Sequence, residues 1–201
     1  MINTLTLVKF EYQPHHVPLG ALYLAYGLEK ANIEFDLKIY RLYKTNGGKA
    51  YAYANINNLY SFLVESGKII AVGCYSSILP FLLNSLKKIK KEFPEKIIIL
   101  GGIGPTIVAE EIMDRFNFID FIIKGCGIIP LPTLVRKIKK GEANFRDIHG
   151  LVYRNDRNVI SNKYEGFYSH ALIPDTLPYY RLNNINSYTE FGVMTSLGCP
   201  Y

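Results

Sequence analysis

Short apolar runs alternate with amphipathic stretches along the first two thirds of this chain. The run at residues 68–77 is almost continuously apolar, which indicates a strand buried on both faces. The stretches between such runs repeat their apolar positions at helical spacing. Strands that alternate with helices are typical of a parallel sheet with helices on both faces, so the sequence predicts the α/β class.

The strands and helices can be placed along the chain. Strands are predicted at residues 5–12, 35–43, 68–77, 96–100 and 119–124. Helices are predicted at residues 18–32, 59–66, 81–93, 108–116 and 131–140. Pro18 suits a first helical turn, and Pro94 ends the third helix. Residues 1–145 should therefore form a five-stranded parallel, doubly wound sheet of flavodoxin-like or Rossmann-like type.

The pattern changes after Gly141. A β-hairpin is predicted within residues 146–162, because two short apolar runs flank a polar turn. Residues 163–190 are rich in proline and tyrosine without periodicity and are interpreted as an extended linker. Residues 191–201 are expected to be the first strand of a further domain.

Composition narrows the function classes. The net charge of +6 comes largely from lysines on amphipathic stretches such as residues 87–91, which are expected to face solvent, so no nucleic-acid partner is predicted. No apolar run approaches the roughly 18 residues of a membrane span, and the start lacks the pattern of a secretion signal, so we expect a cytoplasmic protein. Three scattered cysteines, Cys74, Cys126 and Cys199, do not form a disulfide framework.

A ligand is expected beyond the carboxyl ends of the strands, where doubly wound sheets form their crevice. Three loops meet there: residues 13–20, 75–79 and 101–106. In the third loop, glycines let a ligand approach the backbone closely, although a tight turn explains them equally well. The pattern is not G-x-G-x-x-G, and no acidic residue ends the second strand, which disfavours ordinary dinucleotide binding. The candidate ligand-contacting residues of the three loops are Pro18, Gly20, Tyr75, Ser76, Ser77, Gly101, Gly102, Gly104 and Pro105.

Other candidates near this edge carry alternatives. His15 and His16 lie in the first loop, but without further ligands they favour a turn over a metal site. Gly125, Cys126 and Gly127 follow the fifth strand, where the thiol is either reactive or a small buried group. The serines are alternatively helix caps.

In this order the elements resemble the N-terminal cobalamin-binding domain of B12-dependent radical S-adenosylmethionine (SAM) proteins. Pro18-Leu-Gly20 with the following helix is similar to that family's first helix. Gly101-Gly102 with Pro105 looks like its glycine turn, and residues 148–154 resemble its hairpin. The resemblance implies that the candidate residues, with His16 among them, contact cobalamin.

The strongest match is residues 195–201, which resemble the strand that leads into the C-x-x-x-C-x-x-C cluster motif. The resemblance makes Cys199 the first thiolate ligand of a [4Fe-4S] cluster that binds S-adenosylmethionine. The chain would then be truncated within the motif and followed by a radical SAM barrel. Alternatively, Cys199 is an ordinary residue in a terminal turn.

Two segments depart from related patterns. Residues 13–18 do not fit the D-x-H-x-x-G motif that supplies an axial histidine, although the radical family often lacks it. Cys126 and Ile128 stand where the family typically has glutamates.

The function expected from the resemblance is cobalamin binding, by a fragment that is not catalytic by itself and belongs to a radical enzyme, most often a methyltransferase. One alternative is a degenerate domain that keeps the fold as an interaction module. Another is a nucleotide- or flavin-binding module. Gly102→Val is expected to block a flat ligand and leave the domain folded.

Overall fold

The apolar runs form one sheet, whose seven strands have the order β2-β1-β5-β6-β7-β8-β9. The computed structural model describes residues 4–12, 17–46, 49–51, 56–156, 158–164 and 188–190. The strands of the sheet are β1 (Leu5–Glu11), β2 (Phe35–Arg41), β5 (Ile69–Gly73), β6 (Ile97–Gly101), β7 (Phe121–Ile123), β8 (Leu151–Asn155) and β9 (Asn158–Ser161). Strands β3 (Lys44–Asn46) and β4 (Lys49–Tyr51) form a separate antiparallel pair.

The first five strands of the sheet are parallel, and the last two are antiparallel. The predicted α/β class and the predicted hairpin are therefore confirmed. The hairpin pairs with β7 and extends the sheet, which the sequence pattern did not specify. Among the parallel strands, β1 lies between β2 and β5, which is the switch in strand order that creates a crevice.

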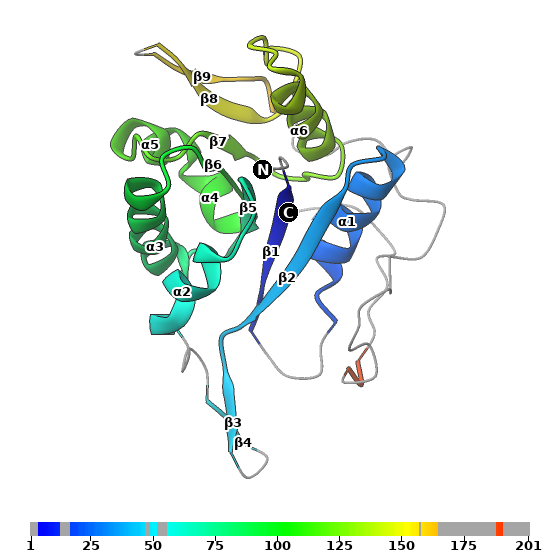
Figure 1. The fold of residues 1–201 in the computed structure, drawn as a ribbon, viewed down its shortest axis with the longest axis vertical. Coiled ribbons are helices and arrows are strands. Elements are labelled where there is room, and N and C mark those ends of the chain that lie inside the picture. The colour runs from blue at the N-terminus through cyan, green and yellow to red at the C-terminus, as the bar shows by residue number, and fades with distance from the viewer. Residues whose placement is uncertain are drawn as a thin grey trace.

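Helices cover both faces of the sheet (Figure 1). One face packs against α1 (Leu19–Lys30) and α6 (Pro130–Lys140), and we call it the α1/α6 face. The other packs against α2 (Leu59–Val64), α3 (Leu79–Glu92) and α5 (Ala109–Arg115), and we call it the α3 face. A short 3₁₀ helix (Ile56–Asn58) precedes α2, and α4 (Ile103–Ile107) follows β6. Alternate residues of each strand contribute to the two cores, as the pleat of a strand requires.

The region after β6 differs from the predicted loop at residues 101–106. Gly101 ends the strand, Gly102 turns the chain, and the remaining residues form α4. Gly102 has φ +83° and ψ 177°, a conformation that is essentially restricted to glycine. The helix predicted at residues 108–116 is thus preceded by a separate short helix.

Strand β5 is also shorter than predicted. It ends at Gly73, and a turn follows in which the amide of Ile78 donates a 3.1 Å hydrogen bond to the carbonyl oxygen of Tyr75. Tyr75, Ser76 and Ser77 therefore lie in the connection to α3, not in the strand. The amide of Cys74 continues the pairing by donating to the carbonyl oxygen of Gly101 at 3.2 Å.

Side chains of the hairpin fasten it to α5. The Arg154 guanidinium donates to the carbonyl oxygens of Ile119 at 2.8 Å and Phe116 at 3.0 Å, and to that of Met113. These contacts satisfy carbonyl groups that the end of a helix leaves unpaired. Lys124 at the end of β7 donates to Glu110 at 2.7 Å and to Ser161 at 2.8 Å.

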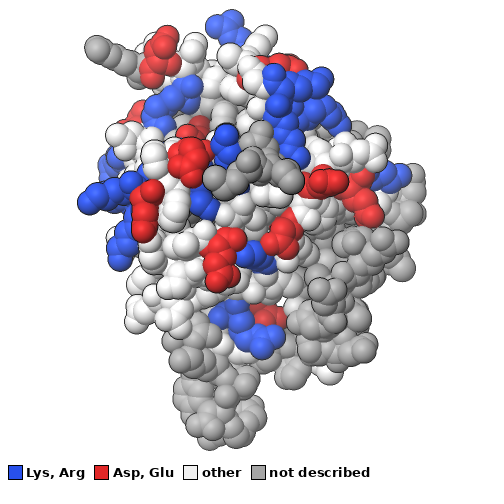
Figure 2. Space-filling model, viewed as in Figure 1, with Lys and Arg blue, Asp and Glu red and all other residues white. Residues whose placement is uncertain are grey.

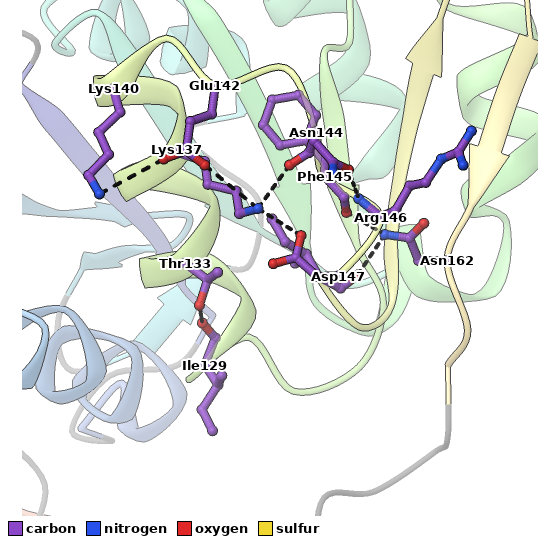
Figure 3. Close-up of polar contacts among 11 residues, drawn as sticks. Ile129, Thr133, Lys137, Lys140, Glu142, Asn144, Phe145, Arg146, Asp147 and Asn162 are labelled. Atoms are coloured by element: carbon purple, nitrogen blue, oxygen red, sulfur yellow. Dashed lines mark hydrogen bonds and ion pairs between the residues drawn. The ribbon is translucent and has the colours of Figure 1, made fainter.

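The connection from α6 to β8 is held by polar contacts (Figure 3). Gly141 ends α6 with φ +70°, the left-handed conformation that commonly closes a helix. Lys137 reaches past the end of the helix and donates to Asp147 at 2.7 Å and to the carbonyl oxygen of Asn144 at 2.9 Å. The Asn162 amide donates to two further carbonyl oxygens of this connection, at 2.7 and 2.8 Å.

One short segment returns to the domain from far along the sequence. The amide of Val17 donates to the carbonyl oxygen of Glu190 at 3.2 Å, and Tyr188 is buried against Val17 and Leu22. The rest of the predicted linker beyond residue 164, with Pro174 and Pro178, and the strand predicted at residues 191–201 lie outside the described residues.

Charges of both signs are interspersed on the face of the molecule in Figure 2. Where the structure describes the chain, no helix has both the length and the apolar character to cross a membrane.

Candidate cofactor-binding site

On the α1/α6 face, the sheet has few side chains at its carboxyl edge. Leu7, Ala71 and Ile99 lie side by side on β1, β5 and β6, and their side chains belong to the α1/α6 core. Two residues further along the same strands, Lys9, Gly73 and Gly101 form the next row. This last row therefore carries one long side chain and two positions with none.

A pocket of about 320 Å³ opens over these two rows, which we call the slot. Its volume is at the lower end of the range for small-molecule sites. Residues of α1, including Gly20 and Leu24, line one side, and residues before and within α6, including Ile128 and Leu131, line another. The slot is thus enclosed by two helices and floored by three parallel strands.

The glycines of the last row are not required by the fold. A Cβ on Gly101 would lie 3.6 Å from the carbonyl oxygen of Ile123, and one on Gly73 would lie 3.6 Å from that of Gly101, both ordinary van der Waals distances. Neither glycine has positive φ. Their lack of a side chain instead leaves room in the slot, as close approach of a ligand to the backbone demands.

Polar and aromatic groups lie around the slot. Tyr12 and Tyr75 contact each other with ring centroids 4.6 Å apart, and the Tyr12 hydroxyl accepts a 3.0 Å hydrogen bond from the Tyr75 amide. Tyr75 remains 52% exposed, so its ring is available to a ligand. The Lys9 amine lies 6.0 Å from the centre of that ring. Burial raises the pKa of the Cys74 thiol to about 12, so this thiol is protonated at neutral pH.

Seven of the residues predicted from the sequence line the slot: Gly20, Tyr75, Gly101, Gly102, Gly125, Cys126 and Gly127. Five do not line it. Pro18 is buried as the N-cap of α1, Ser76 and Ser77 are exposed in the turn before α3, and Gly104 and Pro105 are buried in α4. His15, His16 and Cys199 lie outside the described residues.

Two of the predicted glycines have structural reasons for their identity. A Cβ on Gly102 would lie 2.9 Å from the backbone nitrogen of Cys74, and one on Gly104 would lie 2.8 Å from that of Ser76. Both distances are too short for real contacts. Gly102→Val would therefore strain the backbone in addition to filling the slot, so this variant does not separate a role in the fold from a role in binding.

Sequence reasoning missed the strand residues of the slot, chiefly Lys9, Gly73 and Cys74. The available signal was Lys9, because it is a charged residue within an apolar strand. It is two positions from Leu7, so the two side chains lie on the same face of the sheet. Within the described part of the chain, no group of three His, Cys, Asp or Glu side chains is placed to hold a metal ion.

Comparison with solved structures identifies proteins of similar fold. The cobalamin-dependent SAM radical enzyme OxsB, solved with aqua-cobalamin and SAM, aligns with 82% of this chain at a TM-score of 0.61 and 22% identity. The radical SAM methyltransferase TsrM from Kitasatospora setae, solved with cobalamin and a [4Fe-4S] cluster, aligns with 89% at a TM-score of 0.59 and 18% identity. This chain shares their fold.

The alignments cover only part of these proteins, namely 22% of OxsB and 31% of TsrM. Among curated proteins, the anaerobic magnesium-protoporphyrin IX monomethyl ester cyclase of Synechocystis sp. is 24% identical over 122 residues, which are 56% of this chain and 23% of the cyclase. No protein-family profile matches the chain.

Proposed function

We propose that this domain binds cobalamin at the carboxyl edge of its sheet, with part of the cofactor in the slot. The observation that carries the proposal is the row of Gly73 and Gly101, which leaves space that the fold itself does not need. The shared fold with two proteins solved with cobalamin bound supports this choice over a nucleotide or a flavin.

The residues present fit one part of such a ligand. Cobalamin as a whole is larger than a pocket of about 320 Å³, so only a portion of it would enter the slot. Apolar residues such as Leu7 and Leu131 would exclude water from that portion. The exposed Tyr75 ring beside the opening would contact the part that remains outside.

The described residues would bind and orient the cofactor. In a cobalamin-dependent methyltransferase, bound cobalamin supplies a transferable methyl group, and the protein supplies position and electrostatics. The protonated Cys74 thiol lies at the slot. Cys126 and Ile128 also line it, at the two positions where the related pattern has glutamates. The buried residues Pro18, Gly104 and Pro105 would hold the loops in place without contacting the ligand. His16 is proposed to contribute a contact to the cofactor from the first loop.

The wider proposal concerns the protein to which this domain belongs. Proteins of similar fold are named as radical SAM enzymes, and this domain corresponds to less than a third of each. We therefore propose that it works beside a radical SAM barrel with a [4Fe-4S] cluster and SAM, and that Cys199 is the first cluster ligand. Cobalamin, not the cluster, would be the cofactor held by the residues described above.

Binding can be tested with hydroxocobalamin. Purified protein is incubated with the corrinoid, passed through gel filtration, and examined by visible absorbance, and we expect corrinoid to co-elute. Gly101→Val should abolish retention by filling the slot. Asn158→Val introduces the same side chain at an exposed strand position in the hairpin and should retain the wild-type level. Absence of corrinoid from the wild-type peak would refute the proposal, and retention of a flavin instead would favour a flavin-binding module.

A further inference from the structure

Lys9 is the charged residue of the slot floor. It stands on β1 in register with Gly73, which in turn pairs with Gly101. The preceding residue on the same face, Leu7, is buried in the α1/α6 core. The Lys9 side chain therefore extends over the two glycines and lines the slot.

The ammonium group of Lys9 lacks an anionic partner in the part of the chain that the structure describes. No described carboxylate lies within ion-pair distance, and its neighbours are the Cys74 thiol and the face of the Tyr75 ring. Other half-buried lysines differ in this respect. Lys124 pairs with Glu110 at 2.7 Å, and Lys90 pairs with Asp120 at 2.9 Å.

This arrangement is unfavourable without a ligand. Moving an ammonium away from water costs free energy unless an anion or several acceptors replace the water. Burial accordingly lowers the pKa of the Lys9 side chain. An apolar residue of similar length would fill the same place at lower cost, so the charge points to an anionic group that enters the slot.

We infer that Lys9 recognises a phosphodiester on the portion of the ligand that occupies the slot. The inference rests on the proposed function, because the side amides of cobalamin are neutral and its nucleotide arm carries one phosphodiester. Lysine binds phosphate oxygens as a point charge, and its bonds to anions are stronger than those between neutral groups. The phosphodiester would supply the partner that Lys9 lacks, and Lys9 would act as a specificity-determining residue.

The test compares two corrinoids that differ in this group. Cobalamin carries the nucleotide with its phosphodiester, whereas dicyanocobinamide lacks both. Affinities are measured by equilibrium dialysis with visible absorbance, for the wild type and for Lys9→Met. We expect Lys9→Met to weaken cobalamin binding by about 10- to 100-fold, the loss of one charge-assisted hydrogen bond, and to leave cobinamide binding unchanged.

A matched control removes a lysine in a similar aromatic setting. The Lys88 amine lies 6.0 Å from the centre of the Tyr60 ring, the same distance as between Lys9 and Tyr75, but it is exposed on α3. Lys88→Met should leave the affinities for both corrinoids unchanged. A loss equal to that of Lys9→Met would show an effect of net charge and overturn the inference.

A second readout separates recognition from a structural role. If Lys9 serves the ligand, the ligand-free Lys9→Met protein should be as stable as the wild type or more stable in urea, because a buried charge has been removed. A marked loss of stability would assign Lys9 to the fold and overturn the inference. If the wild type binds neither corrinoid, the proposed function fails and this inference with it. If it binds both and Lys9→Met changes neither affinity, or both equally, only the inference about Lys9 fails.

Discussion

Gly101 and Gly102 are adjacent in sequence and both line the slot, yet substituting them should have different consequences. In Gly102→Ala, the backbone conformation of φ +83° and ψ 177° costs about 1–3 kcal/mol for a residue with a Cβ. The new methyl would also lie 2.9 Å from the Cys74 nitrogen and 3.0 Å from its carbonyl oxygen, which adds about 1–3 kcal/mol of overpacking. We expect the free energy of unfolding to fall by about 2–6 kcal/mol, the sum of these two costs.

Gly101→Ala is the matched control, because its methyl would meet only one atom, at 3.6 Å, without a positive φ. Its free energy of unfolding should stay within about 0.5 kcal/mol of the wild type. Urea unfolding followed by circular dichroism gives both values, and a loss of about 3 kcal/mol should also lower the melting temperature by roughly 6–12 °C. Equal stability of the two variants would refute a structural role for Gly102 and would favour a role in binding the ligand.

Three further outcomes follow from contacts outside the slot. Arg154→Met should lower the free energy of unfolding by about 2–4 kcal/mol in urea, because it leaves carbonyl groups at the end of α5 without a charged donor. Hydrogen bonds from Lys124 and Ser161 hold the pKa of Glu110 below its usual value, so its contribution is present above that value and disappears as the pH falls through the lowered pKa. The stability difference between wild type and Glu110→Gln, measured by urea unfolding across the acid range, should therefore shrink on acidification. Cys74, whose pKa is about 12, should resist iodoacetamide at pH 8 in the folded protein and react after unfolding, as mass spectrometry of its peptide can determine.

The sequence was sufficient for the parallel strands and the hairpin because buried strands are encoded locally, as continuous apolar runs such as the one that forms β5. It was insufficient for α4, whose residues Ile103–Ile107 include a glycine, a proline and β-branched side chains that disfavour helix. This helix depends on distant contacts, such as the 3.0 Å hydrogen bond from the Gly104 amide to the carbonyl oxygen of Cys74. Local propensity carries no information about such a bond.

The candidate site was partly predictable for a related reason. Loops at the carboxyl edge can be named from strand boundaries alone, and Gly20, Tyr75 and Gly101 were found in this way. Lys9 and Gly73 were missed because they lie within strands, and their adjacency depends on which strands pair and in what register. Strand pairing is a long-range property that no single segment encodes.

The two faces of the sheet end differently at the carboxyl edge, and this difference separates stability from binding. On the α3 face, Val8, Val72 and Leu100 form a row of buried apolar side chains that belongs to the core. On the α1/α6 face, the adjacent row contains Lys9 and two glycines and opens into the slot. Because successive residues of a strand point to opposite faces, each strand directs one side chain into the α3 core and places the next position on the α1/α6 face. A ligand bound in the slot would therefore lie on the α1/α6 face, and a variant such as Gly101→Val would fill the slot without removing a side chain from the α3 core.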